Sequence, residues 1–222
     1  LAIVTLETTT AGREKGYGNY NTSPQILDAL RACGVDLVAL ATERALDKGY
    51  DGLDLTLSEL TSRALAYAGV YPDSGNGSAT MMNIDGVQVA VLAYSYGLSD
   101  EGRGQTKNDA VGVLALMDIQ KMTQDITRAR VDGANIVIVL PHWGPKNRAE
   151  TPETVRAMAK ILAQAGADVI LGTHPNVVQG VERIHTVRSD GLTYETVVCY
   201  SLGCLLTDAR NSENTAGMAV NL

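Results

Sequence analysis

Two of the three histidines in this 222-residue sequence directly follow short apolar runs, at positions where a buried strand would end. His142 follows residues 136–141, and His174 follows residues 169–173. Ligands of open α/β sheets bind beyond the carboxyl ends of the strands, and an imidazole there can transfer protons or bind a divalent metal ion. These two histidines are therefore candidate catalytic or metal-binding residues, with a hydrogen-bonded structural pair as the alternative. His185 lies inside a strand pattern and is interpreted as structural.

Charged side chains follow other apolar runs in the same way. Glu7 follows the first run of the chain, Glu43 and Arg44 follow residues 37–41, and Asp47 comes three residues later. We expect the carboxylates to converge with the histidines, with Glu7 as a partner in general acid–base catalysis. Arg44 cannot lose its proton to bind a metal ion, but it can hold a carboxylate or phosphate with two parallel hydrogen bonds. The alternative is that Glu43 is the partner of Arg44.

Three glycines separate helical patterns from the apolar runs that position these residues. Gly34, Gly133 and Gly166 are each followed, after one residue, by Asp or Asn and then by an apolar run. Glycine can adopt the left-handed conformation that ends a helix, and an apolar run of this kind is typical of a buried, parallel strand. The alternation of helices and buried strands predicts a layered α/β fold.

Two hairpins add antiparallel strands to this pattern. Residues 80–84 and 87–94 flank Asp85-Gly86, the preferred residues of a type I′ turn, and residues 181–187 and 193–200 flank a second turn at 189–191. The sheets are therefore predicted to be mixed, with two sheets facing each other between helices. Further helices are predicted over residues 51–68 and 117–131. The polar stretches 8–22 and 95–112 are candidate lids or binding loops.

Composition excludes several classes of protein. The 18 Lys and Arg against 25 Asp and Glu give a net charge of −7, which argues against general nucleic-acid binding. No apolar run is long enough to span a bilayer. The three cysteines form no C-x-x-C pair, so neither a disulfide framework nor a zinc knuckle is indicated. A single domain is expected over residues 1–222, as a processed or trimmed piece of a longer protein because the chain begins at Leu1.

The sequence resembles the bacterial capsule synthesis CapA family, which includes the poly-γ-glutamate synthesis proteins and belongs to the calcineurin-like metallophosphoesterase superfamily. The segments that carry the resemblance are 4–8 (VTLET), 40–47 (LATERALD), 141–144 (PHWG), 166–177 (GADVILGTHPNV) and 200–203 (YSLG). The resemblance implies a four-layer α/β/β/α sandwich of mixed sheets, with the site where loops of the two sheets meet. The opening strand of the family has no counterpart before Leu1.

The chain departs from the family pattern at several metal-binding positions. Glu43 and Arg44 stand in place of the second Asn and the His of the family's Asn-Asn-His. Thr173 and Asn176 replace the first and last histidines of its Gly-His-His-Pro-His, and Cys204 replaces the Asn of Ser-Leu-Gly-Asn. These replacements remove ligands that the family motifs would supply.

The remaining residues predict at most one metal ion. The permanent charge of Arg44 would repel a nearby cation, and a two-metal site needs several carboxylate and imidazole ligands, so a two-metal centre is not expected. His142 and His174 remain and could hold a single divalent ion, such as Zn²⁺ or another imidazole-binding metal, with Glu7 as a possible neighbour.

Three functions are compatible with these features. The first is a hydrolase or phosphoesterase that uses His142 or His174 as general acid–base or as ligands of one metal ion. The second, which we favour, is a degenerate relative that binds an anionic cell-surface polymer or a small phosphate or carboxylate ligand, alone or with other capsule-synthesis subunits. The third is a structural domain with inert histidines. No nucleic-acid partner is expected.

The expected ligand contacts extend beyond the two histidines. Cationic contacts could come from Lys146 and Arg148, and stacking surfaces from Tyr17, Tyr20 and Trp143, although a Trp at a strand end is as often a core residue. The binding residues of the second function are then Glu43, Arg44, Asp47, Trp143, Thr173 and Asn176. The resemblance implies an extracellular or cell-envelope protein, anchored to the membrane only through a segment missing here.

Overall fold

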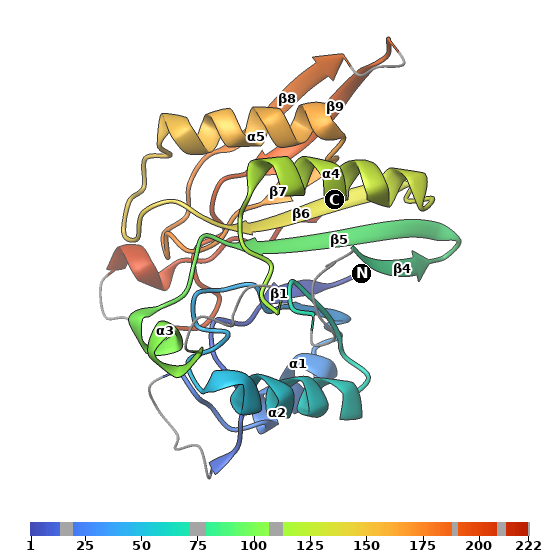
Figure 1. Cartoon of the computed structure of the whole chain (residues 1–222). Coiled ribbons are helices and arrows are strands. Elements are labelled where there is room, and N and C mark those ends of the chain that lie inside the picture. Colours follow the sequence, from blue (N-terminus) through green and yellow to red (C-terminus); the bar gives the residue numbers. More distant parts are fainter. Residues whose placement is uncertain (14–19, 72–78, 107–112, 188–190, 208–211, 222) are drawn as a thin grey trace. The chain divides into compact units, whose positions relative to one another are not determined.

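The computed structural model describes residues 1–13, 20–71, 79–106, 113–187, 191–207 and 212–221 (Figure 1). The chain forms two compact units, each made of two separate segments. Unit 1 comprises Leu1–Thr80 and Ala93–Met117, and unit 2 comprises Met81–Leu92 and Asp118–Leu222. The single domain expected over residues 1–222, and the stacking of the layers, stay predictions.

Unit 1 contains a three-stranded parallel sheet in the order β1-β2-β3. The central strand has no exposed residue, because apolar side chains cover both of its faces. The next helix after it, α2, buries Leu53, Leu57 and Leu60 on one face and packs beside β3. The elements of this unit are β1 (Ile3–Thr5), α1 (Gln25–Ala32), β2 (Leu37–Ala39), α2 (Gly49–Ser62), β3 (Ala66–Ala68) and α3 (Asp100–Thr106).

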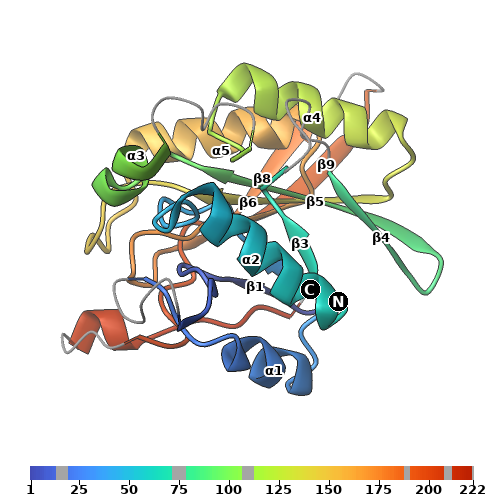
Figure 2. The same cartoon turned by 60° about the horizontal axis from the view of Figure 1, so that its bottom comes forward.

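The six-stranded sheet has the order β4-β5-β6-β7-β9-β8, and all of it except the first residue of β4 and the end of β5 belongs to unit 2. Strands β6, β7 and β9 run parallel, and β8 is antiparallel to β9. Helices α4 and α5 lie side by side along one face of this sheet (Figure 2). The elements are β4 (Thr80–Ile84), β5 (Val87–Ser95), α4 (Ile119–Val131), β6 (Ile136–His142), α5 (Glu153–Ala165), β7 (Val169–Leu171), β8 (Val181–Val187), β9 (Thr193–Cys199) and the short 3₁₀ helix Ser212–Thr215.

The mixed α/β fold predicted from the sequence is confirmed in its local details. Gly34, Gly133 and Gly166 have φ angles of 85°, 98° and 118°, and each follows the end of a helix. Asp85 and Gly86 both have positive φ, as the predicted type I′ turn between β4 and β5 requires. The turn residues 188–190 of the second hairpin lie outside the described residues.

One predicted helix is too long by six residues. The helix expected over residues 51–68 ends at Ser62, because Ala64 adopts a left-handed conformation with a φ of 52°. The amide of Leu65 then donates to the carbonyl of Leu60, and residues 66–68 form β3. Leu65 is buried as predicted, but it lies outside the helix, directly before β3. Parts of the candidate loops, residues 14–19 and 107–112, lie outside the described residues.

Candidate functional site

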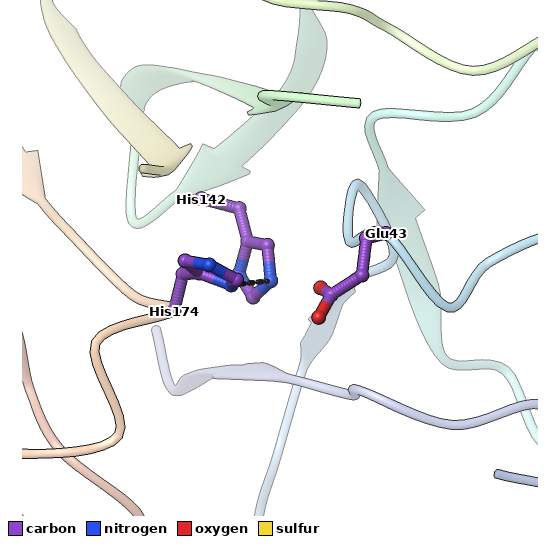
Figure 3. A group of neighbouring side chains, drawn as sticks. All are labelled: Glu43, His142 and His174. Atoms are coloured by element: carbon purple, nitrogen blue, oxygen red, sulfur yellow. Dashed lines mark hydrogen bonds between the residues drawn. The ribbon is translucent and has the colours of Figure 1, made fainter. Parts of the chain in front are cut away.

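The two strand-end histidines of unit 2 lie together in the interior. His142 is the last residue of β6, and His174 follows β7 by three residues. Their exposed fractions are 1% and 6%. Nε2 of His142 lies 3.2 Å from Nδ1 of His174, and the rings meet edge to face with centroids 4.7 Å apart (Figure 3). The structure therefore brings the two imidazoles into hydrogen-bond contact, and their catalytic or metal-binding role stays a prediction.

Backbone pairing beyond the ends of the strands fixes the position of His142. The parallel ladder between β6 and β7 continues as a bridge between His142 and Thr173. The amide of Thr173 donates to the carbonyl of Pro141 at 3.0 Å, and the amide of Trp143 donates to the carbonyl of Thr173 at 3.1 Å. Thr173 Oγ1 consequently lies 2.8 Å from Nδ1 of His142. Thr173, His142 and His174 thus form one hydrogen-bonded series.

His174 has a strained backbone. Its φ is 93°, although it is not glycine and it precedes Pro175, which disfavours such a conformation. Strain of this kind costs about 1–3 kcal/mol and persists only where surrounding contacts impose it. Here the carbonyl of Pro175 accepts a 2.7 Å hydrogen bond from the amide of Asn147. The side chain of Gln179 donates to the carbonyl of Arg148, also at 2.7 Å. The loops after β6 and β7 are therefore tied to each other.

Trp143 is buried against Tyr200. It is 1% exposed, stacks on the ring of Tyr200, and donates from Nε1 to the Tyr200 carbonyl at 2.9 Å. A Cβ at Gly172 would lie 2.1 Å from that carbonyl oxygen and 2.4 Å from the indole nitrogen, so only glycine fits there. Burial raises the pKa of the Tyr200 phenol, which donates to Glu182. Trp143 therefore lies in the core, and its role in ligand binding stays a prediction.

In unit 1, Arg44 is engaged by side chains of the same unit. Its Nη1 lies 3.1 Å from Oδ2 of Asp47, its Nε lies 3.9 Å from Oε1 of Glu43, and its guanidinium lies 3.7 Å from the centre of the Tyr20 ring. The other carboxylate oxygen of Asp47 accepts a hydrogen bond from Ser99. Burial raises the pKa of the Asp47 carboxyl, against the hydrogen bonds from Ser99 and Arg44, which lower it. Two carboxylates and one guanidinium leave this group with a net negative charge.

The remaining predicted residues are distributed over the two units. Glu7, Glu43, Arg44 and Asp47 belong to unit 1, and the histidines belong to unit 2, so their convergence stays a prediction. In unit 2, Asn176 has a φ of 61°, and its carbonyl and amide oxygens lie 3.7 Å from Sγ of Cys204. Lys146 and Arg148 lie in the loop after Trp143. His185 lies exposed on β8, and its structural role stays a prediction. Tyr17 lies outside the described residues.

Two polar residues, one in each unit, hold candidate site residues in place and were not predicted from the sequence. Ser99 lies in a polar stretch without periodicity, and its contact with Asp47 spans 52 residues. Gln179 is buried and holds Arg148 and Thr151, but a single glutamine in a loop carries no pattern. Neither role has a local sequence signal.

The histidine pair fits the ligand set of one imidazole-binding metal ion. Two nitrogens bound to one tetrahedral zinc, each at about 2.0–2.1 Å, lie about 3.3 Å apart. Nε2 of His142 and Nδ1 of His174 lie 3.2 Å apart, which is close to that separation. A metal-binding histidine usually donates its other ring N–H to an acceptor, and Thr173 Oγ1 is placed to accept from Nδ1 of His142.

A comparison with known protein families shows to which family this chain belongs. The model of the family "Bacterial capsule synthesis protein PGA_cap" matches residues 1–209. The chain belongs to this family. The resemblance to capsule synthesis proteins found in the sequence motifs is thereby confirmed.

Curated PGA_cap relatives are considerably longer than this chain. The PGA biosynthesis protein CapA of Bacillus subtilis (strain 168) is 28% identical over 189 residues, which cover 84% of this chain and 46% of the relative. The capsule biosynthesis protein CapA of Bacillus anthracis is 27% identical over 190 residues, which cover 83% of this chain and 43% of the relative. The chain therefore spans less than half the length of these two relatives.

Solved structures similar to this PGA_cap chain include two enzymes. The calcineurin-like phosphoesterase YfkN of Bacillus subtilis has a TM-score of 0.48 and 18% identity, covering 73% of this chain and 50% of its own. The sulfate thiohydrolase SoxB of a Thermus species has a TM-score of 0.47 and 15% identity, covering 79% of this chain and 34% of its own.

Proposed function

We propose that this chain serves the synthesis or export of an anionic capsule polymer by binding carboxylate or phosphate groups through one divalent metal ion. His142 and His174 would hold the ion. The observation that carries the proposal is the 3.2 Å separation of two buried imidazole nitrogens, with Thr173 on the outer nitrogen of His142. Membership in the capsule synthesis family supplies the class of ligand, since poly-γ-glutamate carries one carboxylate per residue.

The two histidines would supply two nitrogen ligands and leave further coordination positions for water or ligand oxygens. A bound divalent ion would attract carboxylate or phosphate oxygens as a Lewis acid. Lys146 and Arg148, in the loop after β6, would add cationic contacts along an extended anionic chain. Arg44 is a weaker candidate for such contacts, because its charge is engaged by Asp47 and Glu43.

Hydrolysis at the same site is the second candidate function. It is favoured by the strained backbone of His174, because residues in rarely populated conformations gather at active sites. In this function one histidine would bind the ion or donate a proton to a leaving group, and the substrate would be a phosphoester. Turnover of bis(p-nitrophenyl) phosphate that requires added Zn²⁺ and is lost in His174→Ala would support this function.

We further propose a cell-envelope location and other capsule-synthesis subunits as partners. Both proposals are in keeping with the capsule biosynthesis named for the two curated relatives. Among the described residues, no helix has both the length and the apolar character that a membrane span requires. Fractionation of the full-length product tests the location, and recovery in the cytosol would contradict it.

Metal titration of chelator-stripped protein tests the main proposal. We expect the wild type to bind close to one equivalent of Zn²⁺, and His142→Ala and His174→Ala each to abolish tight binding. The matched control is His185→Ala, because His185 is exposed on β8 beside Glu195 and should leave zinc binding unchanged. If the wild type binds two equivalents of Zn²⁺ and His142→Ala loses both, the site is a two-metal centre. If the wild type binds no Zn²⁺, the proposal is contradicted.

Ligand binding is then measured with inorganic phosphate and with γ-glutamate oligomers, with and without Zn²⁺. The proposal requires binding that depends on both the ion and the two histidines. Equal binding by the wild type and by His142→Ala would show that the anion is held elsewhere.

A further inference from the structure

We propose that Thr173 is a positioning residue that holds His142 as the Nδ1–H tautomer, so that Nε2 presents its lone pair. Thr173 itself would not touch the ligand. In the part that concerns metal binding, this inference rests on the proposed function. In the part that concerns the tautomer, it stands on the geometry of the loops after β6 and β7.

The backbone holds Thr173 in place independently of its side chain. It is paired on both sides, through its amide to Pro141 and through its carbonyl to Trp143. The neighbouring Gly172 is held by its own backbone, because its amide donates to the carbonyl of Cys199 and its carbonyl accepts from the amide of Leu202. Oγ1 of Thr173 is therefore held at 2.8 Å from Nδ1 of His142 by contacts that a change of its side chain would leave intact.

A neutral imidazole carries one ring N–H, so the partner of one nitrogen determines what the other can do. If Nδ1 of His142 donates to Thr173, Nε2 is left with a lone pair directed at the Nδ1 side of His174. Thr173 is half-buried, and for Oγ1 to accept from Nδ1 its own hydroxyl hydrogen must be donated to another acceptor, such as water. In the opposite arrangement Nε2 of His142 carries the hydrogen. In either arrangement the hydrogen between Nε2 of His142 and Nδ1 of His174 must leave before one ion can bind both nitrogens.

The position of Thr173 in the series gives it a role that His174 cannot take over. His174 contacts the Nε2 end of His142, the end that would bind an ion, whereas Thr173 contacts the Nδ1 end. Loss of the hydroxyl would remove the acceptor for Nδ1–H and release the ring to rotate or change tautomer. Outer partners of metal-binding histidines typically contribute about 10–100-fold to metal affinity.

The test compares the wild type with Thr173→Val, which keeps the shape and removes the hydroxyl, and Thr173→Ser, which keeps the hydroxyl. Ring ¹⁵N chemical shifts of His142 in metal-free protein report which nitrogen carries hydrogen. We expect Nδ1–H in the wild type and in Thr173→Ser, and a shift toward Nε2–H in Thr173→Val. Unchanged amide spectra away from the loop would verify that each variant folds.

Zinc affinity is measured on the same three proteins. We expect Thr173→Val to bind Zn²⁺ about 10–100-fold more weakly and Thr173→Ser to stay within about threefold of the wild type. An Nε2–H tautomer in the wild type, or a Thr173→Val protein with the wild-type tautomer, would overturn the inference. If the wild type binds no zinc but the tautomer changes as expected, the positioning role stands and the proposed metal-dependent function fails.

Discussion

Nη1 of Arg44 lies 3.1 Å from Oδ2 of Asp47, a carboxylate with no exposed surface. The same carboxylate accepts a hydrogen bond from Ser99 on its other oxygen, and Tyr20 covers the guanidinium. The arginine that replaces a family histidine therefore belongs to an internal network of unit 1. This network predicts that Arg44 contributes to the stability of the folded protein.

Replacing Arg44 with Met should destabilise the protein, because the buried Asp47 carboxylate would lose its cationic partner and keep, among the described residues, the hydrogen bond from Ser99. Removing one partner of a buried ion pair typically costs about 3–5 kcal/mol, and we expect a value near the lower end because Arg44 is partly exposed. Urea unfolding measures the change. Arg44→Lys should recover part of the loss. An Arg44→Met protein of wild-type stability that binds phosphate more weakly would instead assign the guanidinium to a ligand.

Asp47 should make the unfolding free energy depend on pH. Its pKa is raised in the folded state by burial, so the folded protein binds this proton more tightly than the unfolded chain does. The cost of the buried charge is then fully present above the raised pKa and disappears as the pH falls from there toward the ordinary Asp pKa of about 3.9. The stability of the wild type relative to Asp47→Asn should therefore increase on acidification through this range, by at most about 1.4 kcal/mol per pH unit. A difference that is constant with pH would contradict this.

Gly172→Ala should destabilise unit 2 and displace Thr173 from His142. The new methyl group would overlap the Tyr200 carbonyl, which is backbone and cannot rotate away, so we expect a loss of about 1–3 kcal/mol or more. Gly180→Ala is the matched control, because a Cβ there meets no atom within 4 Å. Thermal unfolding of the two variants, compared with the wild type, measures the difference. Equal stability of both variants would show that the contact at Gly172 is relaxed.

The fluorescence of the single tryptophan reports on the same region. Since Trp143 is buried against Tyr200, its emission should be blue-shifted and resistant to iodide quenching in the folded protein. Unfolding in urea should shift the emission to the red and expose it to iodide. Strong iodide quenching of the folded protein that γ-glutamate oligomers relieve would instead show that Trp143 lies on the ligand-binding surface.

The parts of the fold that the sequence predicted depend on neighbouring residues. A glycine after a helical pattern can take the left-handed conformation wherever it occurs, and Gly34, Gly133 and Gly166 all do so. His142 and His174 were placed together by the same local reasoning, since parallel strands end at one edge of a sheet. These predictions needed no knowledge of which segments pack together.

The parts that were missed depend on contacts between distant segments. Ala64 takes a positive φ only because the turn around Leu60 and Leu65 closes there, and alanine carries no signal for such a turn. Glu43 was the alternative partner considered for Arg44, and it does lie 3.9 Å away, but the closer carboxylate is Asp47, which also accepts a hydrogen bond from Ser99. The buried state of Trp143 likewise depends on Tyr200, 57 residues away.

Each unit is made of two separate segments of the chain, and this determines the order in which the parts of each unit are synthesised. Residues 81–92 belong to unit 2, but they leave the ribosome before the second segment of unit 1 and long before residues 118–222. Strand β5, with a run of buried residues from Val89 to Ser95, must therefore wait for β6 with an unpaired apolar edge. Such edges invite pairing with other chains. A nascent chain stalled near residue 117 should thus need a chaperone to stay soluble, and no single cut in the gene would yield both units intact.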